Sequence, residues 1–399
     1  LAALKKEEKE SRAEVPWRQW GKDLDPEAVT QMRNACALPV AVRGALMPDA
    51  HVGYGLPIGG VLAVRNAVVP YAVGVDITCR MKLTVLDWPV SALEERTDEL
   101  RMAIESETRF GVGATFRQRR RHAVMDTDWA FSPVTRQYKD TAWAQLGTSG
   151  SGNHFVEFGV LETATAVLGL TPGRYLALLS HSGSRGTGAA VCEHYSKLAQ
   201  QQQEDLPKEQ RHLAWLSLDQ EAGNEYWQAM QLMGAYAAAN HGLIHQHIAA
   251  HLGAQVLLDI ENHHNFAWKE EHDGEEVVVH RKGATPAASG VLGIIPGSMA
   301  APGYVVRGRG VRESLTSASH GAGRCLSRTK ARNTFHWEEM NAYLKSRKVT
   351  LLSADIDEAP MAYKDIHSVM EAQSDLVEVL ARFDPRLVKM APAGERPED

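Results

Sequence analysis

The chain has few cysteines and no long apolar run. Its four cysteines are widely separated along the sequence, and none belongs to a Cys-x-x-Cys pair. Such spacing is untypical of a disulfide framework, so we expect reduced thiols and a cytoplasmic protein. No apolar stretch approaches the roughly 20 residues that cross a bilayer, and the opening residues are too polar for a secretory signal. We therefore expect no membrane association.

A global excess of positive charge is also absent. The formal net charge is −6, so nucleic-acid binding would require a local basic patch. Residues 117–122 read Arg-Gln-Arg-Arg-Arg-His and hold four arginines in six positions. The sequence supports two interpretations of this run about equally, a solvated loop or helix face and a patch that binds nucleic acid.

Composition and periodicity indicate a large α+β protein. Hydrophobic residues make up 44% of the 399 positions and charged residues 23%, as is typical of a soluble protein with a sizeable core. Short apolar or alternating runs predict strands, and apolar residues at helical spacing predict helices. We expect strands at 56–64, 82–87, 154–160, 175–180, 277–280 and 304–306, and helices at 91–107, 188–201, 217–252 and 365–381.

No repeat or linker divides the chain, and its helices and strands do not alternate regularly. We therefore predict one mixed α+β domain over residues 1–390, with central sheets wrapped by helices and an active site where distant loops converge. Residues 391–399 are polar and show no packing pattern, so we expect a disordered tail there.

Two segments combine a possible metal ligand with a tight turn. Asp76 and Cys79 stand three apart and could hold one ion or share two, although an isolated Asp-x-x-Cys is more often a surface carboxylate beside a buried thiol. Glycines and serines at 147–152 offer backbone N–H groups that suit phosphate, just before His154. The alternative for His154 is a hydrogen-bonded core residue after a tight turn.

Two further histidine segments follow predicted strands. His181 lies at the end of one strand and before a helix whose N-terminus suits an anion. His263 and His264 are adjacent, and neighbouring side chains point in opposite directions on extended chain. At most one of these two can therefore bind a given ion.

The most informative segment is His-Gly-Ala-Gly-Arg at 320–324. His320 is a nitrogen nucleophile among small residues, and Arg324 supplies a fork suited to phosphate. Together with the ligand segments, this pattern suggests metal-assisted nucleotidyl transfer through a histidine–nucleotide intermediate. A mixed oxygen, sulfur and nitrogen ligand set accepts zinc, manganese or iron; softness favours zinc, whereas a triphosphate partner would favour manganese.

Two His-x-x-x-His pairs, at 241/245 and 247/251, have the helical spacing of zinc ligands. They lack the glutamate of the His-Glu-x-x-His motif, so we interpret them as a solvated helix face.

Eight segments occur in an order that resembles the RtcB family of RNA ligases, from about residue 15 to 390. They lie at 47–60, 73–79, 150–157, 181–186, 264–265, 296–299, 320–324 and 357–364. The resemblance implies an enzyme that joins RNA ending in a 3′-phosphate or 2′,3′-cyclic phosphate to a 5′-hydroxyl end, with GTP and two Mn²⁺ ions. Its biological setting would be RNA repair or tRNA splicing.

The resemblance also assigns metal ligands and catalytic residues. Cys79 would bridge the two ions, one held with Asp76 and His154, the other with His181 and His264. The nucleophile would be His320, which takes GMP from GTP. Arg324 and Asp49 would complete the catalytic set, with Asp49 near the metal ions.

The resemblance further implies a GTP pocket, in which Glu157 would accept hydrogen bonds from the guanine edge. The implied lining comprises Asn153, His154, Phe155, Val156, Glu157, His264, Asn265, Pro296, Gly297, Ser298, Met299, Gly303, His320, Gly321, Ala322, Gly323, Tyr363 and Lys389.

The chain departs from the family pattern at a few positions. Gly303 and Ser319 stand where the family usually has Ser and Cys, His241 replaces an arginine, and Met390 replaces the glycine after Lys389. These departures bear on nucleotide preference and RNA handling, because none is a proposed metal ligand or nucleophile.

Two other functions are compatible with the same residues. A phosphatase or cyclic phosphodiesterase acting on RNA ends would keep the metal ions but needs no histidine nucleophile. A catalytically weak paralogue would bind RNA or nucleotide without turnover. The sequence leaves open an activating protein partner and the choice between monomer and homodimer.

Overall fold

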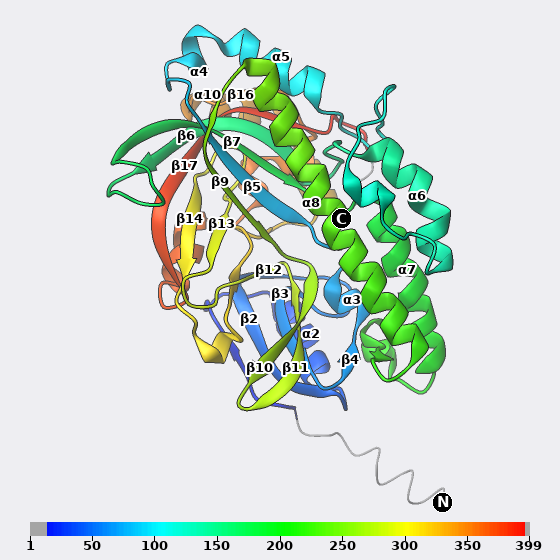
Figure 1. Ribbon diagram of the computed structural model, residues 1–399. Coiled ribbons are helices and arrows are strands. Elements are labelled where there is room, and N and C mark those ends of the chain that lie inside the picture. The colour runs from blue at the N-terminus through cyan, green and yellow to red at the C-terminus, as the bar shows by residue number, and fades with distance from the viewer. Residues whose placement is uncertain (1–13, 396–399) are drawn as a thin grey trace, which may run out of the picture.

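The protein's computed structural model describes residues 14–395 and has the mixed α+β architecture that the sequence predicts (Figure 1). Two larger β-sheets form its centre, and helices pack around them. No disulfide joins any of the four cysteines. Within the described residues, no helix combines the length and the apolar character that a membrane span requires.

The smaller of the two main sheets has five strands and occupies the lower part of Figure 1. Its first two strands pair in parallel and the others antiparallel. The strand order is β1 (Trp17–Gln19), β2 (Ala41–His51), β3 (Ile58–Val64), β11 (Glu275–Lys282) and β10 (Phe266–His272).

The larger sheet is antiparallel along its main path, with one further strand, β16 (Thr350–Ser353), parallel to β17. Its order is β13 (Leu292–Ile295), β14 (Gly303–Gly308), β17 (Val377–Met390), β6 (Phe155–Thr163), β7 (Gly173–Ser182), β5 (Arg80–Leu86) and β9 (Val256–His263). Two short pairs complete the strands: β4 (Ala67–Val68) with β8 (Leu216–Ser217), and β12 (Ala284–Pro286) with β15 (Ser317–Ser319).

The register of the larger sheet brings segments that are distant in sequence together at one end of its strands. Arg80 at the start of β5 pairs with Ser182 near the end of β7 and with His263 at the end of β9. Phe155 at the start of β6 pairs with His181. Antiparallel pairing therefore places the segments just before β5 and β6 beside the ends of β7 and β9.

A long helix, α8, crosses one side of this sheet and packs against α5 and α7. The α-helices are α2 (Pro26–Cys36), α3 (Pro70–Val73), α4 (Ala92–Glu95), α5 (Thr97–Glu107), α6 (Pro133–Gln145), α7 (Arg185–Gln202), α8 (Glu221–Leu252), α9 (Arg328–Thr334), α10 (Trp337–Ser346) and α11 (Ile366–Ala372).

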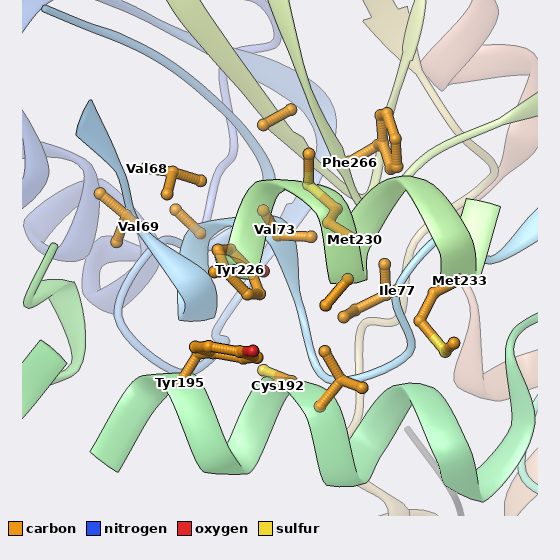
Figure 2. Packing of buried hydrophobic residues seen from close by; sticks show 14 of the residues in the cluster. Val68, Val69, Val73, Ile77, Cys192, Tyr195, Tyr226, Met230, Met233 and Phe266 are labelled. Carbon is orange, nitrogen blue, oxygen red and sulfur yellow. The ribbon is translucent and has the colours of Figure 1, made fainter. Parts of the chain in front are cut away.

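The part of the largest apolar cluster that Figure 2 shows lies between α7, α8 and the segment that leads into β5. Tyr195 from α7 and Tyr226 from α8 are fully buried with ring centroids 5.1 Å apart. Ile77 is also fully buried in this cluster, beside Met230 and Met233 of α8. Burying a side chain of this size contributes about 1.5–3 kcal/mol, so the cluster anchors the turn on either side of residue 77.

The predicted strands are present, with boundaries shifted by a few residues, but three helix predictions need correction. The helix predicted at 365–381 ends at Ala372, and the following residues form β17. The segment from Val377 pairs with both β14 and β6, so strand pairing overrides its local helical pattern. The helix predicted at 91–107 is interrupted at Arg96, and α8 begins at Glu221 because residues 216–217 pair with β4.

The predicted tail is described only to residue 395. Residues 391–395 contain no helix or strand, and the Glu395 carboxylate accepts a hydrogen bond from the Val112 N–H at 3.2 Å. The charged N-terminal segment and residues 396–399 lie outside the described residues.

Candidate active site

The five predicted metal ligands converge where the starts of β5 and β6 lie beside the ends of β7 and β9. His154 Nε2 lies 3.0 Å from an Asp76 oxygen and 3.5 Å from the Cys79 sulfur. His181 Nε2 lies 2.9 Å from the same sulfur and 3.2 Å from His264 Nε2. All five side chains are buried.

These residues form two groups that could each hold a metal ion, and both groups contain Cys79. One comprises Asp76, Cys79 and His154, the other Cys79, His181 and His264, and within each group the candidate ligand atoms lie within 4.8 Å of one another. A thiolate can contact two cations at once, so this geometry is compatible with a bridging sulfur. The mixed donor set suits a borderline divalent cation.

Hydrogen bonds on the outer side orient the histidine ligands. His154 Nδ1–H donates to the Ser149 carbonyl at 2.9 Å, and His181 Nδ1–H donates to the Asn153 carbonyl at 3.2 Å. Each bond leaves the Nε2 lone pair directed at the cluster, as in many metal sites. Burial lowers the pKa of His181 to about 3, which keeps that ring neutral. Neutral imidazoles converging on a thiol and a carboxylate suit a bound cation.

The turn that carries the aspartate and cysteine ligands is strained and well anchored. Thr78 adopts φ +61°, which is unusual for a β-branched residue. Its N–H donates to the Asn265 carbonyl at 2.8 Å, while Ile77 is packed into the core. The N-terminus of α7 holds the Asp76 carboxylate through the Ser184 N–H at 3.0 Å. The anion site predicted at this helix end is thus occupied by the carboxylate of Asp76.

Burial opposes ionisation of Asp76, but its contacts with His154 and Cys79 and the nearby charge of Arg185 keep the pKa of its carboxyl below the usual range. The carboxylate is therefore in the charged form that binds cations.

The predicted nucleophile lies next to this cluster and is held by a carboxylate. The His264 and His320 ring centroids are 4.8 Å apart. His320 Nδ1–H donates to Asp49 Oδ2 at 2.7 Å, and the His320 backbone N–H donates to the same oxygen at 3.1 Å. With its proton on Nδ1, the ring presents the Nε2 lone pair as a nucleophile.

Asp49 is fully buried on β2, and its ionised form is stabilised by its neighbours. Burial opposes ionisation, but the hydrogen bond from His320 and the positive charge of Lys364 hold the pKa of Asp49 below its usual range. Lys364 donates to the carbonyls of Pro48 and Ala50, at 3.1 and 2.7 Å, and so anchors the strand on both sides of the aspartate.

A cavity of about 630 Å³ opens beside the cluster and the histidine. Four predicted residues, Asp49, His154, Val156 and Lys389, do not line it. The predicted residues that do line it are Asp76, Cys79, Asn153, Phe155, Glu157, His181, His264, Asn265, Pro296, Gly297, Ser298, Met299, Gly303, His320, Gly321, Ala322, Gly323, Arg324 and Tyr363.

Strand alternation explains one of these placements. Phe155 and Glu157 face the cavity, whereas Val156 between them packs into the apolar core on the other side of β6. Lys389 extends toward Glu105, with 3.8 Å between their charged atoms. Asp49 and His154 lie behind the cavity wall, where each contacts a residue that lines it.

A family model described as tRNA-splicing ligase RtcB matches residues 31–390, which is most of the chain. The chain belongs to the RtcB family. It is 36% identical over 403 aligned residues to RNA-splicing ligase RtcB of Escherichia coli (strain K12), covering 92% of this chain and 95% of that relative. It is 30% identical to tRNA-splicing ligase RtcB of Nanoarchaeum equitans, covering 94% and 95%, and 29% identical to that of Methanococcus maripaludis, covering 93% and 92%. The protein is therefore an RNA ligase enzyme.

In this RtcB-family ligase, Arg324 lies at the cavity but is engaged by the protein. Its guanidinium donates to the Asp357 carbonyl at 2.7 Å and to the Tyr363 hydroxyl at 3.3 Å, and it also pairs with Glu358 at 3.4 Å. Binding phosphate through its fork would require some of these contacts to be exchanged.

Several cavity residues were missed by sequence reasoning. His51, Lys282, Arg328 and Glu358 all line the cavity. Burial lowers the pKa of Lys282 to about 8, and its ammonium donates to the Tyr54 carbonyl at 2.6 Å. A single charged residue in a strand or loop has no spacing signature. The signal in the sequence was that His51 and Glu358 lie inside two of the matched segments and that Arg328 lies close to a third.

The interpretation of the His-x-x-x-His pairs is correct for one pair and wrong for the other. His247 and His251 are at least partly exposed and lie near Glu107. His241 and His245 are buried instead, and both contact the Ser180 hydroxyl, at 3.3 and 2.8 Å. They form polar contacts between α8 and the larger sheet. Among the described residues, neither histidine belongs to a group of three possible metal ligands.

Asn240 beside them is a further residue that sequence reasoning missed. Its side chain accepts from the Gly147 N–H at 2.7 Å and donates to the Thr148 carbonyl at 2.9 Å. The Ser149 carbonyl, one residue further along the loop, accepts a hydrogen bond from His154 Nδ1–H. The loop predicted to cradle phosphate thus also orders His154, a predicted metal ligand, and Asn240 holds that loop from α8.

Proposed function

We propose that this ligase joins RNA ending in a 3′-phosphate or 2′,3′-cyclic phosphate to a 5′-hydroxyl end, using GTP, Mn²⁺ and a covalent His320–GMP intermediate. The observation that carries the proposal is the Asp49–His320 pair. The carboxylate fixes the ring proton on Nδ1, so Nε2 is left unprotonated beside the metal cluster.

The two ligand groups would each hold one ion, with Cys79 common to both. Bound Mn²⁺ would neutralise phosphoryl charge and help to align attacking and leaving oxygens. Softness of the donors alone favours zinc, but the oxygens of a nucleoside triphosphate would shift the preference toward manganese.

The reaction would proceed in three displacements. His320 Nε2 attacks the α-phosphorus of GTP, a P–N bond forms, and pyrophosphate leaves. An oxygen of the RNA 3′-phosphate then attacks the same phosphorus, so the P–N bond breaks and GMP is joined to the RNA end. Finally the 5′-hydroxyl attacks the RNA phosphorus, its proton passes to solvent, and GMP leaves. A cyclic end would first take up water to become a 3′-phosphate.

Residues of the cavity wall would recognise the nucleotide. Burial raises the pKa of Glu157 well above its usual range. Two N–H donors from a guanine edge would compensate the buried carboxylate, which gives a physical reason for a guanine preference. The backbone of 321–323, which lies on the same cavity as His320, can approach a phosphate closely because its residues are small.

Labelling with GTP tests this mechanism directly. With Mn²⁺ present, α-³²P-GTP should label the wild-type protein in an acid-labile bond, whereas γ-³²P-GTP should not, because pyrophosphate leaves. The His320→Ala variant should lose the label, and the exposed His336→Ala variant should retain it. Undiminished labelling of His320→Ala would refute the covalent intermediate.

The same assay separates the alternatives. A hydrolase acting on RNA ends would release phosphate or open cyclic ends without GTP and without any adduct. A non-catalytic relative would bind GTP or RNA without either change. The fully assembled nucleophile beside the ligand groups favours ligation over both. With free thiols in the core, we also propose a cytoplasmic location.

A further inference from the structure

A second cavity, of about 830 Å³, lies outside the active site and is strongly basic. Its lining includes five arginines and one histidine but a single acidic residue, Glu107. It is formed mainly by the irregular segment 109–121 between α5 and α6, together with the last turn of α5. The run of arginines that the sequence left ambiguous is therefore one wall of a groove.

The arginines of this groove differ in how their charge is compensated. Arg119 pairs with Asp140 at 2.6 Å, and Arg120 pairs with Glu107 at 3.0 Å. Arg117 and Arg121 are exposed, and among the described residues neither has an ion pair or a hydrogen bond. Arg109 donates only to backbone carbonyls, such as that of Glu105 at 2.8 Å. Three of the five arginines thus keep an uncompensated positive charge.

The same segment is tied to the loop that orders the metal site. The Gly111 N–H donates to the Gly150 carbonyl at 2.8 Å, and the Ser149 N–H donates to the Arg109 carbonyl at 2.9 Å. The carbonyl of Ser149 in turn accepts a hydrogen bond from His154, a predicted metal ligand. The backbone of the groove is therefore hydrogen-bonded to the segment that positions the reacting centre.

The groove also holds an aromatic ring close to two guanidinium groups. The Arg120 guanidinium lies 4.0 Å from the centre of the Phe116 ring, and that of Arg109 lies 4.9 Å from it. Planar, weakly hydrated guanidinium groups pack well against bases as well as phosphates. An arrangement of charges with one aromatic residue is more typical of a nucleic-acid surface than of an apolar protein interface.

We propose that this groove binds the phosphodiester backbone of the RNA substrate at a distance from its reacting end, with Arg117 and Arg121 as the principal phosphate contacts. The assignment of RNA rests on the proposed function. A ligase must hold strands beyond the few atoms that react, and the net charge of −6 leaves such binding to local patches.

Binding should be measured by fluorescence anisotropy with a single-stranded RNA of about 20 nucleotides that ends in a 5′-phosphate and a 3′-hydroxyl. These ends are not substrates of the proposed reaction, so the measurement is independent of it. The Arg117→Ala/Arg121→Ala variant should bind about tenfold more weakly, and the slope of log K against log salt should fall by about 1.4, since each single-strand phosphate contact contributes about 0.7.

The Arg117→Lys/Arg121→Lys variant keeps both charges and should retain most of the affinity. Arg33→Ala/Arg174→Ala is the matched control, because both arginines are exposed and lie elsewhere, on α2 and β7. Equal losses in the groove and control variants, or no loss in either, would overturn the proposal. Tighter binding of polyglutamate than of RNA would overturn it too, in favour of an acidic protein partner.

Labelling by α-³²P-GTP shows whether a wrong result concerns RNA binding by the groove or the proposed His320–GMP chemistry. The groove variant should form the His320 adduct within about twofold of wild type, because Arg117 and Arg121 do not line the nucleotide cavity. Loss of RNA affinity with an intact adduct supports the groove. Loss of the adduct in this variant would show that the substitution disturbs the metal site, and would overturn the assignment of a separate RNA contact.

Discussion

At the scale of single residues, the site depends on side chains whose ionisation is set by burial. Asp49 and Asp76 are both buried, yet neighbouring hydrogen bonds and the charges of Lys364 and Arg185 lower the pKa of their carboxyl groups. Glu157 has no such partner, and burial raises the pKa of its carboxyl. The pKa is therefore lowered for two of these carboxyl groups and raised for the third before any ligand binds. The first two suit contact with a histidine or a cation, and the third suits a ligand that donates hydrogen bonds.

Glu157→Gln should stabilise the ligand-free protein at neutral pH. A carboxyl whose folded pKa lies above its unfolded value contributes most stability below the unfolded value, near pH 4.5, and loses that contribution as pH rises through the folded value. The glutamine variant should thus melt at a higher temperature than wild type at pH 7, and the difference should vanish near pH 4. Thermal unfolding across this range measures it.

The same variant should bind GTP more weakly, because glutamine cannot carry the charge that the guanine donors would compensate. A variant no more stable than wild type at neutral pH would show that Glu157 is not an unfavourably buried carboxyl.

At the scale of elements, the nucleophile depends on close approach between two backbone segments. Gly323 has φ +74°, and a Cβ there would overlap the Asp49 carbonyl on β2. The Lys364 N–H also donates to the Gly323 carbonyl at 2.9 Å. The loop after β15 can therefore lie against β2 only with glycine at this position. This close approach brings His320 within hydrogen-bonding distance of Asp49.

Gly323→Ala should destabilise the fold by about 1–3 kcal/mol from backbone strain alone, plus the cost of steric overlap. It should also reduce labelling by GTP, because His320 would be displaced from Asp49. Gly290→Ala is the matched control: Gly290 has φ +83° but nothing within 4 Å of a Cβ. Denaturant unfolding and labelling compare the two, and equal effects would show that the contact with β2 is unimportant.

At the scale of the whole molecule, the candidate metal site joins segments that are far apart in the sequence. The turn before β5, the start of β6 and the ends of β7 and β9 each supply ligands. A cation bound there would cross-link these segments only in the folded state, so its binding should stabilise the protein as a unit.

Adding Mn²⁺ at about 100 times its dissociation constant should therefore stabilise the wild-type protein by about 2.7 kcal/mol per independent site, visible as a higher unfolding temperature that a chelator reverses. Cys79→Ala should lose most of this shift. Cys192→Ala, which removes another buried thiol away from the cluster, should keep it. A full Mn²⁺ shift in Cys79→Ala would exclude the bridging role.

The sequence by itself predicted which residues gather at the candidate site. The ligands Asp76 and Cys79, the histidines beside small residues and His320 all lie in short segments whose residue types and spacing carry the signal. Local turns and strand starts need only a few neighbouring residues, so their predictions agree with the structure. The α+β class was determined in the same way, from periodicity along short runs.

Only the tertiary structure decided which residues face the cavity and which lie behind it. Val156 and Lys389 point elsewhere, whereas Lys282 lines the cavity without any local signature. Strand pairing made residues 377–390 a strand, and packing against the larger sheet buried His241 and His245. These outcomes depend on contacts between segments far apart in the chain, and local patterns do not encode such contacts.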